Sequence, residues 1–200
     1  MKKLVFKLIF LASLFLPFYK SVHAQKLKFL IPDGVIVQHA GSIGYFSGGI
    51  NYNLFKRKKG NLDILYGFVP ADKGGAFSTL STKFSFQPFE IRINKWITLF
   101  PVSPGAFLNY MIGNDFDLTW SNEQYPGGYY YWSEALRAHI SISNEVKFHS
   151  KKSSEKKLQS LALYYEINTN DAYLVNYVQN SGTISLSDIF FGGFGLRVKF

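Results

Sequence analysis

The sequence predicts an all-β fold, an eight-stranded antiparallel up-and-down β-barrel whose strands cross a membrane. Aromatic residues make up 18% of the 200-residue chain, with 20 Phe and 13 Tyr, and such residues favour strands. Segments that alternate apolar and polar residues recur along the chain, and a period of two is that of a strand. The final segment, Ile189 to Phe200, alternates strictly over its second half and ends on an aromatic residue.

The N-terminal 24 residues are expected to be a cleaved secretory signal peptide. Two lysines follow the initiating methionine, an apolar run covers residues 4–18, and Val22-His23-Ala24 has the small residues of a cleavage site. The barrel domain would then be residues 25–200. Removing the four lysines of the leader leaves 18 basic and 13 acidic residues, a net charge of +5. An exported chain of this charge is not expected to bind nucleic acid.

The rest of the chain divides into eight alternating segments. No later segment is long and apolar enough for a transmembrane helix. Strands can cross a bilayer only as a closed barrel, because every backbone N–H and C=O must be hydrogen-bonded within the protein. The predicted strands are Gly34–Gln38 (with an alternative start at Leu27), Ile43–Phe55, Leu62–Val69, Phe77–Gln87, Trp96–Ile112, Glu134–Phe148, Leu158–Asn170 and Ile189–Phe200.

The first four predicted strands are separated by clear turn signals. Val35 and Val37 share the outer face of the first strand, and a tight turn at His39-Ala40-Gly41 follows, with His39 as a solvated loop residue. The next connection, residues 56–61, is short and basic, and the one after it contains Gly74-Gly75. The bulky faces of strands two to four comprise Phe46, Ile50, Tyr52 and Leu54, then Leu62, Ile64, Tyr66 and Phe68, then Leu80, Phe84 and Phe86.

The last four predicted strands are longer. Pro101 and Pro104 each remove a ladder donor, so a bulge or bend is expected in the fifth strand. The sixth strand has the clearest alternation, and its apolar face is Leu136, Ala138, Ile140, Ile142, Val146 and Phe148. Two long loops are predicted, one over 113–133 with the aromatic run Tyr125–Trp132, and one over Asp171–Asp188.

Two arrangements fit this alternation: a soluble lipocalin-like barrel with the apolar faces inside, and a membrane barrel with the apolar faces outside. The polar faces are rich in Ser, Asn and Gly, whereas a soluble surface is coated with Lys and Glu. Most charges fall in the turns. The apolar faces are also too bulky on all strands together to fit inside eight strands. These observations favour the membrane barrel, with polar side chains in its interior.

The C-terminal strand carries a family resemblance. Phe194, Leu196, Val198 and Phe200 alternate with Gly193, Gly195, Arg197 and Lys199. This pattern resembles the closing strand of bacterial outer-membrane β-barrels, and the chain resembles the small OmpA/OmpX-like barrels. The resemblance implies an outer-membrane location with periplasmic turns and extracellular loops, and a monomeric barrel. It also implies contact with outer-membrane lipids and lipopolysaccharide, and recognition by the barrel-assembly machinery through Phe194, Leu196, Val198 and Phe200.

A set of candidate catalytic residues lies on the predicted inner face. His139, Ser141 and Glu145 share one face of the sixth strand, and Glu166 lies on the next strand. A His, a Ser and a carboxylate are the parts of a nucleophilic hydrolase. The His-x-Ser spacing resembles that of outer-membrane lipid A deacylases, although Ile142 stands where that motif has Asn. The favoured alternative is an interior ion-pair network of Lys83, Arg137, Lys147, Arg197 and Lys199 with Asp63, Glu145, Glu166 and His139.

Three roles are compatible with these sequence features. The favoured one is a structural or surface-interaction barrel that is not a wide pore. The first alternative is an outer-membrane hydrolase that modifies lipid A or phospholipid. The chain has no cysteine and four scattered histidines, so neither a cofactor nor a metal site is expected. The second alternative is a narrow channel for small polar solutes, lined by Asn51, Asn53, Ser81 and Arg137.

Overall fold

The computed structural model describes residues 30–55, 59–113, 116, 133, 135–150 and 158–200, and residues 32–200 form one compact unit. The predicted signal peptide, residues 1–24, and the aromatic run Tyr125–Trp132 lie outside the described residues. Within the described ranges, no helix is long and apolar enough to cross a membrane.

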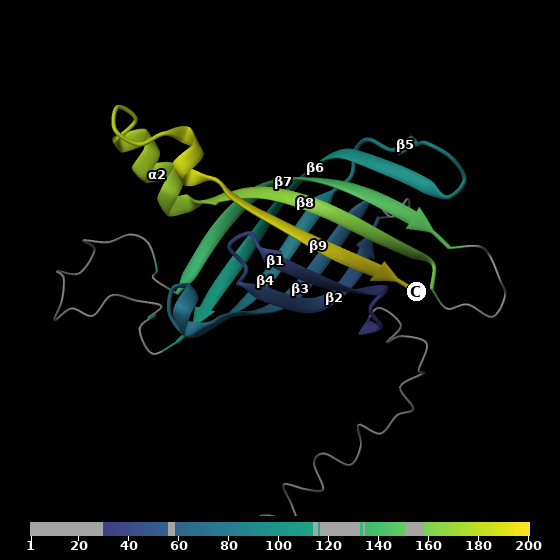
Figure 1. The fold of residues 1–200 in the computed structure, drawn as a ribbon, viewed down its shortest axis with the longest axis horizontal. Helices are drawn as coiled ribbons and strands as arrows, with labels where there is room; N and C mark the ends of the chain where they lie inside the picture. The colour runs from purple at the N-terminus through teal and green to yellow at the C-terminus, as the bar shows by residue number, and fades with distance from the viewer. Residues whose placement is uncertain (1–29, 56–58, 114–115, 117–132, 134, 151–157) are drawn as a thin grey trace, which may run out of the picture. The chain divides into compact units, whose positions relative to one another are not determined.

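Eight long strands form a closed antiparallel barrel, as predicted (Figure 1). Successive long strands pair with one another, and β1 (Gly34–Ala40) pairs with β9 (Phe191–Lys199) to close the sheet. Each strand lies within a few residues of its predicted position. The other six long strands are β2 (Phe46–Leu54), β3 (Gly60–Val69), β4 (Phe77–Phe86), β6 (Ile97–Ile112), β7 (Leu136–His149) and β8 (Ser160–Asn170).

A short additional strand, β5 (Ile91–Arg92), was not predicted. It pairs with the first residues of β6, whereas β4 pairs only with the later part of β6. Between these two stretches, the register of β6 against β7 shifts from Phe100 to Ser103. The irregularity predicted from Pro101 and Pro104 is therefore confirmed. The ladder donors that the prolines remove lie where β6 changes its partner from β5 to β4.

The connection between β8 and β9 is partly helical, so the prediction of a loop over Asp171–Asp188 was wrong. It contains α2 (Asp171–Gln179) and a 3-10 turn, η4 (Leu186–Ile189); a second 3-10 turn, η3 (Ala71–Lys73), joins β3 and β4. The side chain of Asn170 accepts a hydrogen bond from the backbone N–H of Tyr173 at 2.9 Å and so caps the N-terminus of α2. In Figure 1, α2 and the C-terminus lie at opposite ends of the barrel.

His39 lies in a strand, so its prediction as a solvated loop residue was wrong. It is paired with Phe46 of β2 and Phe194 of β9, and its ring centroid is 4.9 Å and 5.2 Å from theirs. The ring also meets Tyr45 edge-on at 4.7 Å. Aromatic neighbours on both sides therefore extend β1 two residues beyond its predicted end at Gln38. The turn begins at Gly41, whose positive φ of 76° suits glycine.

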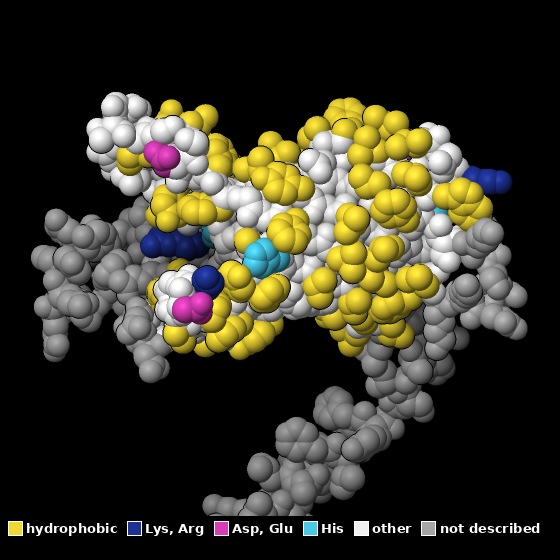
Figure 2. All heavy atoms as spheres, viewed as in Figure 1, with side chains coloured by type: hydrophobic (Ala, Val, Ile, Leu, Met, Phe, Trp, Pro, Cys, Tyr) yellow, Lys and Arg dark blue, Asp and Glu magenta, His cyan; other side chains and the backbone are white. Residues whose placement is uncertain are grey.

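The barrel has a polar interior and an apolar outer wall, as the alternation predicted. Inside, Lys83 and Glu166 are each 1% exposed, whereas Ile142 and Phe194 on the outer wall are each 60% exposed. Figure 2 shows hydrophobic side chains over much of the visible face of the barrel. The interior also holds one small apolar cluster, formed by Ile36, Ile43, Leu65, Phe107 and Tyr164.

Adjacent glycines of β2 provide a matched test of how closely the strands approach. A Cβ on Gly49 would overlap the backbone carbonyl of Ile64 on β3, whereas a Cβ on Gly48 would have its nearest neighbour, the carbonyl oxygen of Ile36, at 3.9 Å. We expect Gly49→Ala to lower the free energy of unfolding by roughly 1–3 kcal/mol through overpacking, and Gly48→Ala to change it by much less. Urea unfolding of both variants checks this. Equal effects would contradict the close approach of β2 and β3.

Candidate functional site

Arg197 is the central cation of the barrel interior. Its Nη2 donates to Asp63 Oδ2 at 2.8 Å, and its Nη1 donates to the Glu145 carboxylate. All three side chains are buried. Arg197 comes from β9, Asp63 from β3 and Glu145 from β7, and none of these strands is adjacent to another in the sheet. The two ion pairs therefore cross the interior and tie separate parts of the wall together.

A second cation, Lys83 of β4, lies in the same interior. Its Nζ donates to Glu166 Oε2 on β8 at 3.2 Å and to Gln38 Oε1 on β1 at 2.9 Å. The Tyr164 hydroxyl donates to the same Gln38 oxygen at 2.7 Å. The Tyr164 ring centroid is 5.0 Å from Lys83 Nζ and 5.1 Å from the Arg197 guanidinium carbon, so both cations contact this ring. Cation–π contacts of this kind stabilise buried charges.

Further polar contacts extend this arrangement. Lys147 Nζ is 3.3 Å from Glu145 Oε1, and Lys199 Nζ donates to Asn61 Oδ1 at 2.7 Å and to the amide oxygen of Asn53. We refer to the following residues as the interior network: Gln38, Asn51, Asn53, Asn61, Asp63, Lys83, Glu145, Lys147, Tyr164, Glu166, Arg197 and Lys199. Its buried charges are compensated by opposite charges or hydrogen bonds, as burial requires.

The predicted interior network is thus confirmed for four of its five cations. Arg137 instead lies nearer the end of the barrel, where its Nη1 is 3.9 Å from Asp171 Oδ1 of α2. His139 is buried, but it stacks on the Phe107 ring with centroids 4.2 Å apart. Sequence spacing placed both residues on the inner face, but it could not determine their partners.

The four candidate catalytic residues are not gathered at one point. His139 and Ser141 both lie on the buried face of β7. Glu145 is six residues from His139 on the same strand, roughly 20 Å away, and is paired with Arg197 and Lys147. Ser141 is paired with Asn168, and Glu166 lies roughly 7 Å further along β8 with Lys83 as its partner. Neither carboxylate is positioned to orient the imidazole of His139.

Two of the residues predicted to line a narrow channel donate hydrogen bonds to side chains on the neighbouring strand. Asn51 Nδ2 donates to Asp63 Oδ1 at 2.6 Å, and Ser81 Oγ donates to Asn109 Oδ1 at 2.7 Å. Both donors are buried. These amide and hydroxyl groups are therefore engaged in cross-strand hydrogen bonds, and a passing solute would have to replace those bonds.

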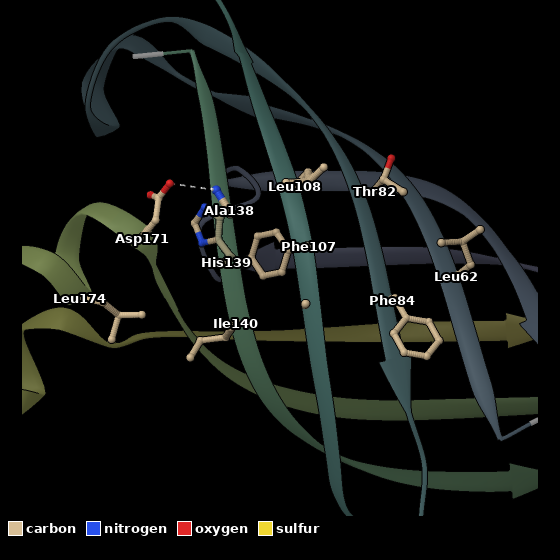
Figure 3. A pocket seen from close by; sticks show the side chains of 11 residues that line it. Leu62, Thr82, Phe84, Phe107, Leu108, Ala138, His139, Ile140, Asp171 and Leu174 are labelled. Atoms are coloured by element: carbon tan, nitrogen blue, oxygen red, sulfur yellow. Dashed lines mark hydrogen bonds between the residues drawn. The ribbon is translucent and has the colours of Figure 1, made fainter. Parts of the chain in front are cut away.

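A groove on the outer wall was not predicted from the sequence. It has a volume of about 390 Å³ and crosses β3, β4, β6 and β7 near the start of α2 (Figure 3). Thr82 is paired with Leu108, which is paired with Ala138, and in the next row Ala106 lies between Phe84 and Ile140. Small side chains on three strands thus leave a hollow among larger ones. We call it the outer-wall groove; it is lined by Leu62, Thr82, Phe84, Ala106, Phe107, Leu108, Ala138, His139, Ile140, Asp171 and Leu174.

No protein-family model, no curated protein and no solved structure matches the chain. Across the part of the chain that the structure describes, no three His, Asp or Glu side chains gather as a group that could hold a metal ion. The geometry of the barrel itself therefore provides the basis for a functional proposal.

Proposed function

We propose that this chain is a small outer-membrane β-barrel with a structural or surface-interaction role, and that it is not a wide pore. The observation that carries the proposal is the polarity of the barrel: charged side chains such as Lys83 and Arg197 are inside, and large apolar side chains such as Ile142 and Phe194 are outside. An apolar wall of this extent suits hydrocarbon, and a closed barrel satisfies its backbone hydrogen bonds without water.

The interior network supports a role other than that of a wide pore. Eight strands enclose a space just wide enough to be filled by side chains. Here the Arg197 pairs with Asp63 and Glu145 cross that space, and the contacts of Lys83 with Glu166 and Gln38 cross it as well. Opening a wide passage would require these buried charges to lose their partners, which costs several kcal/mol for each ion.

The connections support one orientation in the membrane. The strands β2, β4 and β7 end where β9 ends, near the C-terminus (Figure 1). The sequences that follow them, residues 55–59, 87–96 and 150–159, each contain more basic than acidic residues. The connection with α2 lies at the opposite end. With the basic turns in the periplasm, α2 is extracellular. The partners are then outer-membrane lipids and lipopolysaccharide along the wall, and the barrel-assembly machinery at β9, for a barrel that is a monomer.

Two readouts on the purified protein and on cells separate this role from its alternatives. We expect no porin-sized conductance when the protein is added to planar bilayers, because the interior network fills the barrel. We also expect the acyl pattern of lipid A, measured by mass spectrometry, to be the same in cells with and without the protein. A steady small conductance would favour the narrow channel. If lipid A lost an acyl chain in cells with the protein, and Ser141→Ala prevented that loss, the result would favour the hydrolase.

A further inference from the structure

The outer-wall groove differs from the rest of the wall in shape and in its surroundings. Leu108 and Ile140, which line it, are both more than half exposed, so the groove opens outward. Ala106 and Ala138 line it with small side chains, which we call its floor. Phe84 also lines it, and Figure 3 labels Phe84 and Ala138. Leu174 of α2 adds an apolar side chain from outside the sheet. The groove is therefore an apolar hollow that crosses four strands of the wall beside α2.

The end of the groove beside α2 carries charge. Strand β8 ends at Asn170, and Asp171 then lies beside Ala138, whose backbone N–H donates to Asp171 Oδ2 at 3.4 Å. The other oxygen of Asp171 is 3.9 Å from Arg137 Nη1, which is longer than a hydrogen bond. The Arg137 side chain remains 19% exposed. Its guanidinium has five donors in a fork, so it can pair with a second anion while remaining near Asp171.

We propose that the outer-wall groove binds one acyl chain of an anionic membrane lipid and that Arg137 pairs with the phosphate of its headgroup. This inference rests on the membrane location proposed above. In that location the groove faces hydrocarbon, where lipid tails are the abundant apolar molecules. Arg137 lies outside the lining but next to Asp171, which lines the groove at its end beside α2, where the headgroups would be. From there the apolar lining crosses β7, β6, β4 and β3.

Filling the groove tests the acyl-chain contact. The protein is reconstituted into nanodiscs of equal amounts of phosphatidylcholine and phosphatidylglycerol, and the lipid it retains after release into detergent is identified by native mass spectrometry. We expect the wild-type protein to retain one phosphatidylglycerol in preference to phosphatidylcholine. Ala106→Phe places a ring on the floor, and losing contact with about two methylenes lowers retention roughly tenfold. Gly48→Phe adds the same ring to the wall on β2, where a Cβ has room, and should leave retention unchanged.

The headgroup contact has its own variant. Arg137→Gln combined with Asp171→Asn removes the cation without leaving an unpaired carboxylate. We expect it to retain a lipid but to lose the preference for phosphatidylglycerol. If Ala106→Phe does not fold, as judged by the heat-dependent shift on a gel, Ala138→Leu fills the same floor and replaces it.

Two outcomes overturn the inference and are distinguishable from failure of the proposed function. A wild-type protein that enters nanodiscs but retains no lipid, or retains it equally after Ala106→Phe, contradicts the groove inference while the membrane location stands. A protein that does not enter the nanodiscs at all contradicts the proposed function. Equal retention of both lipids by the wild-type protein would contradict the role of Arg137.

Discussion

Replacing Arg197 with methionine is expected to lower the free energy of unfolding by about 3–5 kcal/mol, the largest effect of any single substitution in the barrel interior. The reason is that Asp63 and Glu145 would remain buried with their main cation removed. Methionine has a similar length and leaves little empty space, so the loss would report mainly on charge. Urea unfolding of the detergent-solubilised barrel, followed by the gel shift of the folded form, measures it.

Two further variants control this experiment. Lys73→Met removes a cation whose ion pair with Asp72 is exposed to solvent, and it should change the free energy of unfolding by less than about 0.5 kcal/mol. Combining Arg197→Met with Asp63→Asn removes the carboxylate that loses its ion-pair partner, while Glu145 keeps Lys147 at 3.3 Å, and the pair of substitutions should recover part of the lost stability. If Arg197→Met is no less stable than Lys73→Met, the interior network does not stabilise the barrel.

Replacing Phe200 with aspartate is expected to remove most of the folded protein from the outer membrane while changing the stability of the assembled barrel little. Phe200 continues β9, its backbone N–H donates to the carbonyl of Asp33 at 3.0 Å, and its side chain is among the exposed hydrophobic ones. At the end of a strand a charge on the wall costs only about 0–1 kcal/mol. Under the proposed function, the step that a charge at this position disturbs is recognition of β9 during assembly.

The assay for Phe200→Asp compares the heat-shifted band in outer-membrane fractions with that of Phe200→Tyr, which keeps an aromatic ring at the terminus. Refolding both variants from urea into detergent separates assembly in the cell from stability. Normal abundance of Phe200→Asp in the membrane would contradict a recognition role for this end of β9.

The barrel could be predicted because its signal is local. Alternation within β7 and β9 assigns each side chain to one of two faces without any knowledge of partners. The bulk of Phe, Tyr and Ile on one face and the small polar residues on the other then determine which face is inside. The bulge in β6 was equally local, since Pro101 and Pro104 remove donors wherever they occur in a strand.

The parts that could not be predicted depend on neighbours distant in sequence. His39 belongs to a strand because Phe46 and Phe194 pack on either side of it, and neither is adjacent in sequence. β5 forms because β6 continues past the end of β4 and offers free backbone groups. The outer-wall groove exists because the strand register places Ala106 and Ala138 in adjacent rows of the outer wall. The one signal of this groove in the sequence was a small residue on an otherwise bulky apolar face.

α2 was missed for a different reason. Its sequence, beginning at Asp171, is short and contains β-branched and aromatic residues that propensity assigns to strands or loops. Its capping residue, Asn170, was interpreted as the end of a strand. Because a polar residue can either end a strand or cap a helix, Asn170 alone does not indicate that a helix follows.

Solvent accessibility of the outer wall in a bilayer tests the central claim most directly. The chain has no cysteine, so single cysteines can be placed by Ile142→Cys on the wall and by Asp72→Cys in the connection between β3 and β4. Both side chains are exposed in the isolated barrel, by 60% for Ile142 and 73% for Asp72. In nanodiscs we predict that a membrane-impermeant maleimide labels Asp72→Cys readily and leaves Ile142→Cys protected until detergent or denaturant is added. Equally fast labelling of the two cysteines in nanodiscs would show that the wall faces water and would contradict a membrane barrel.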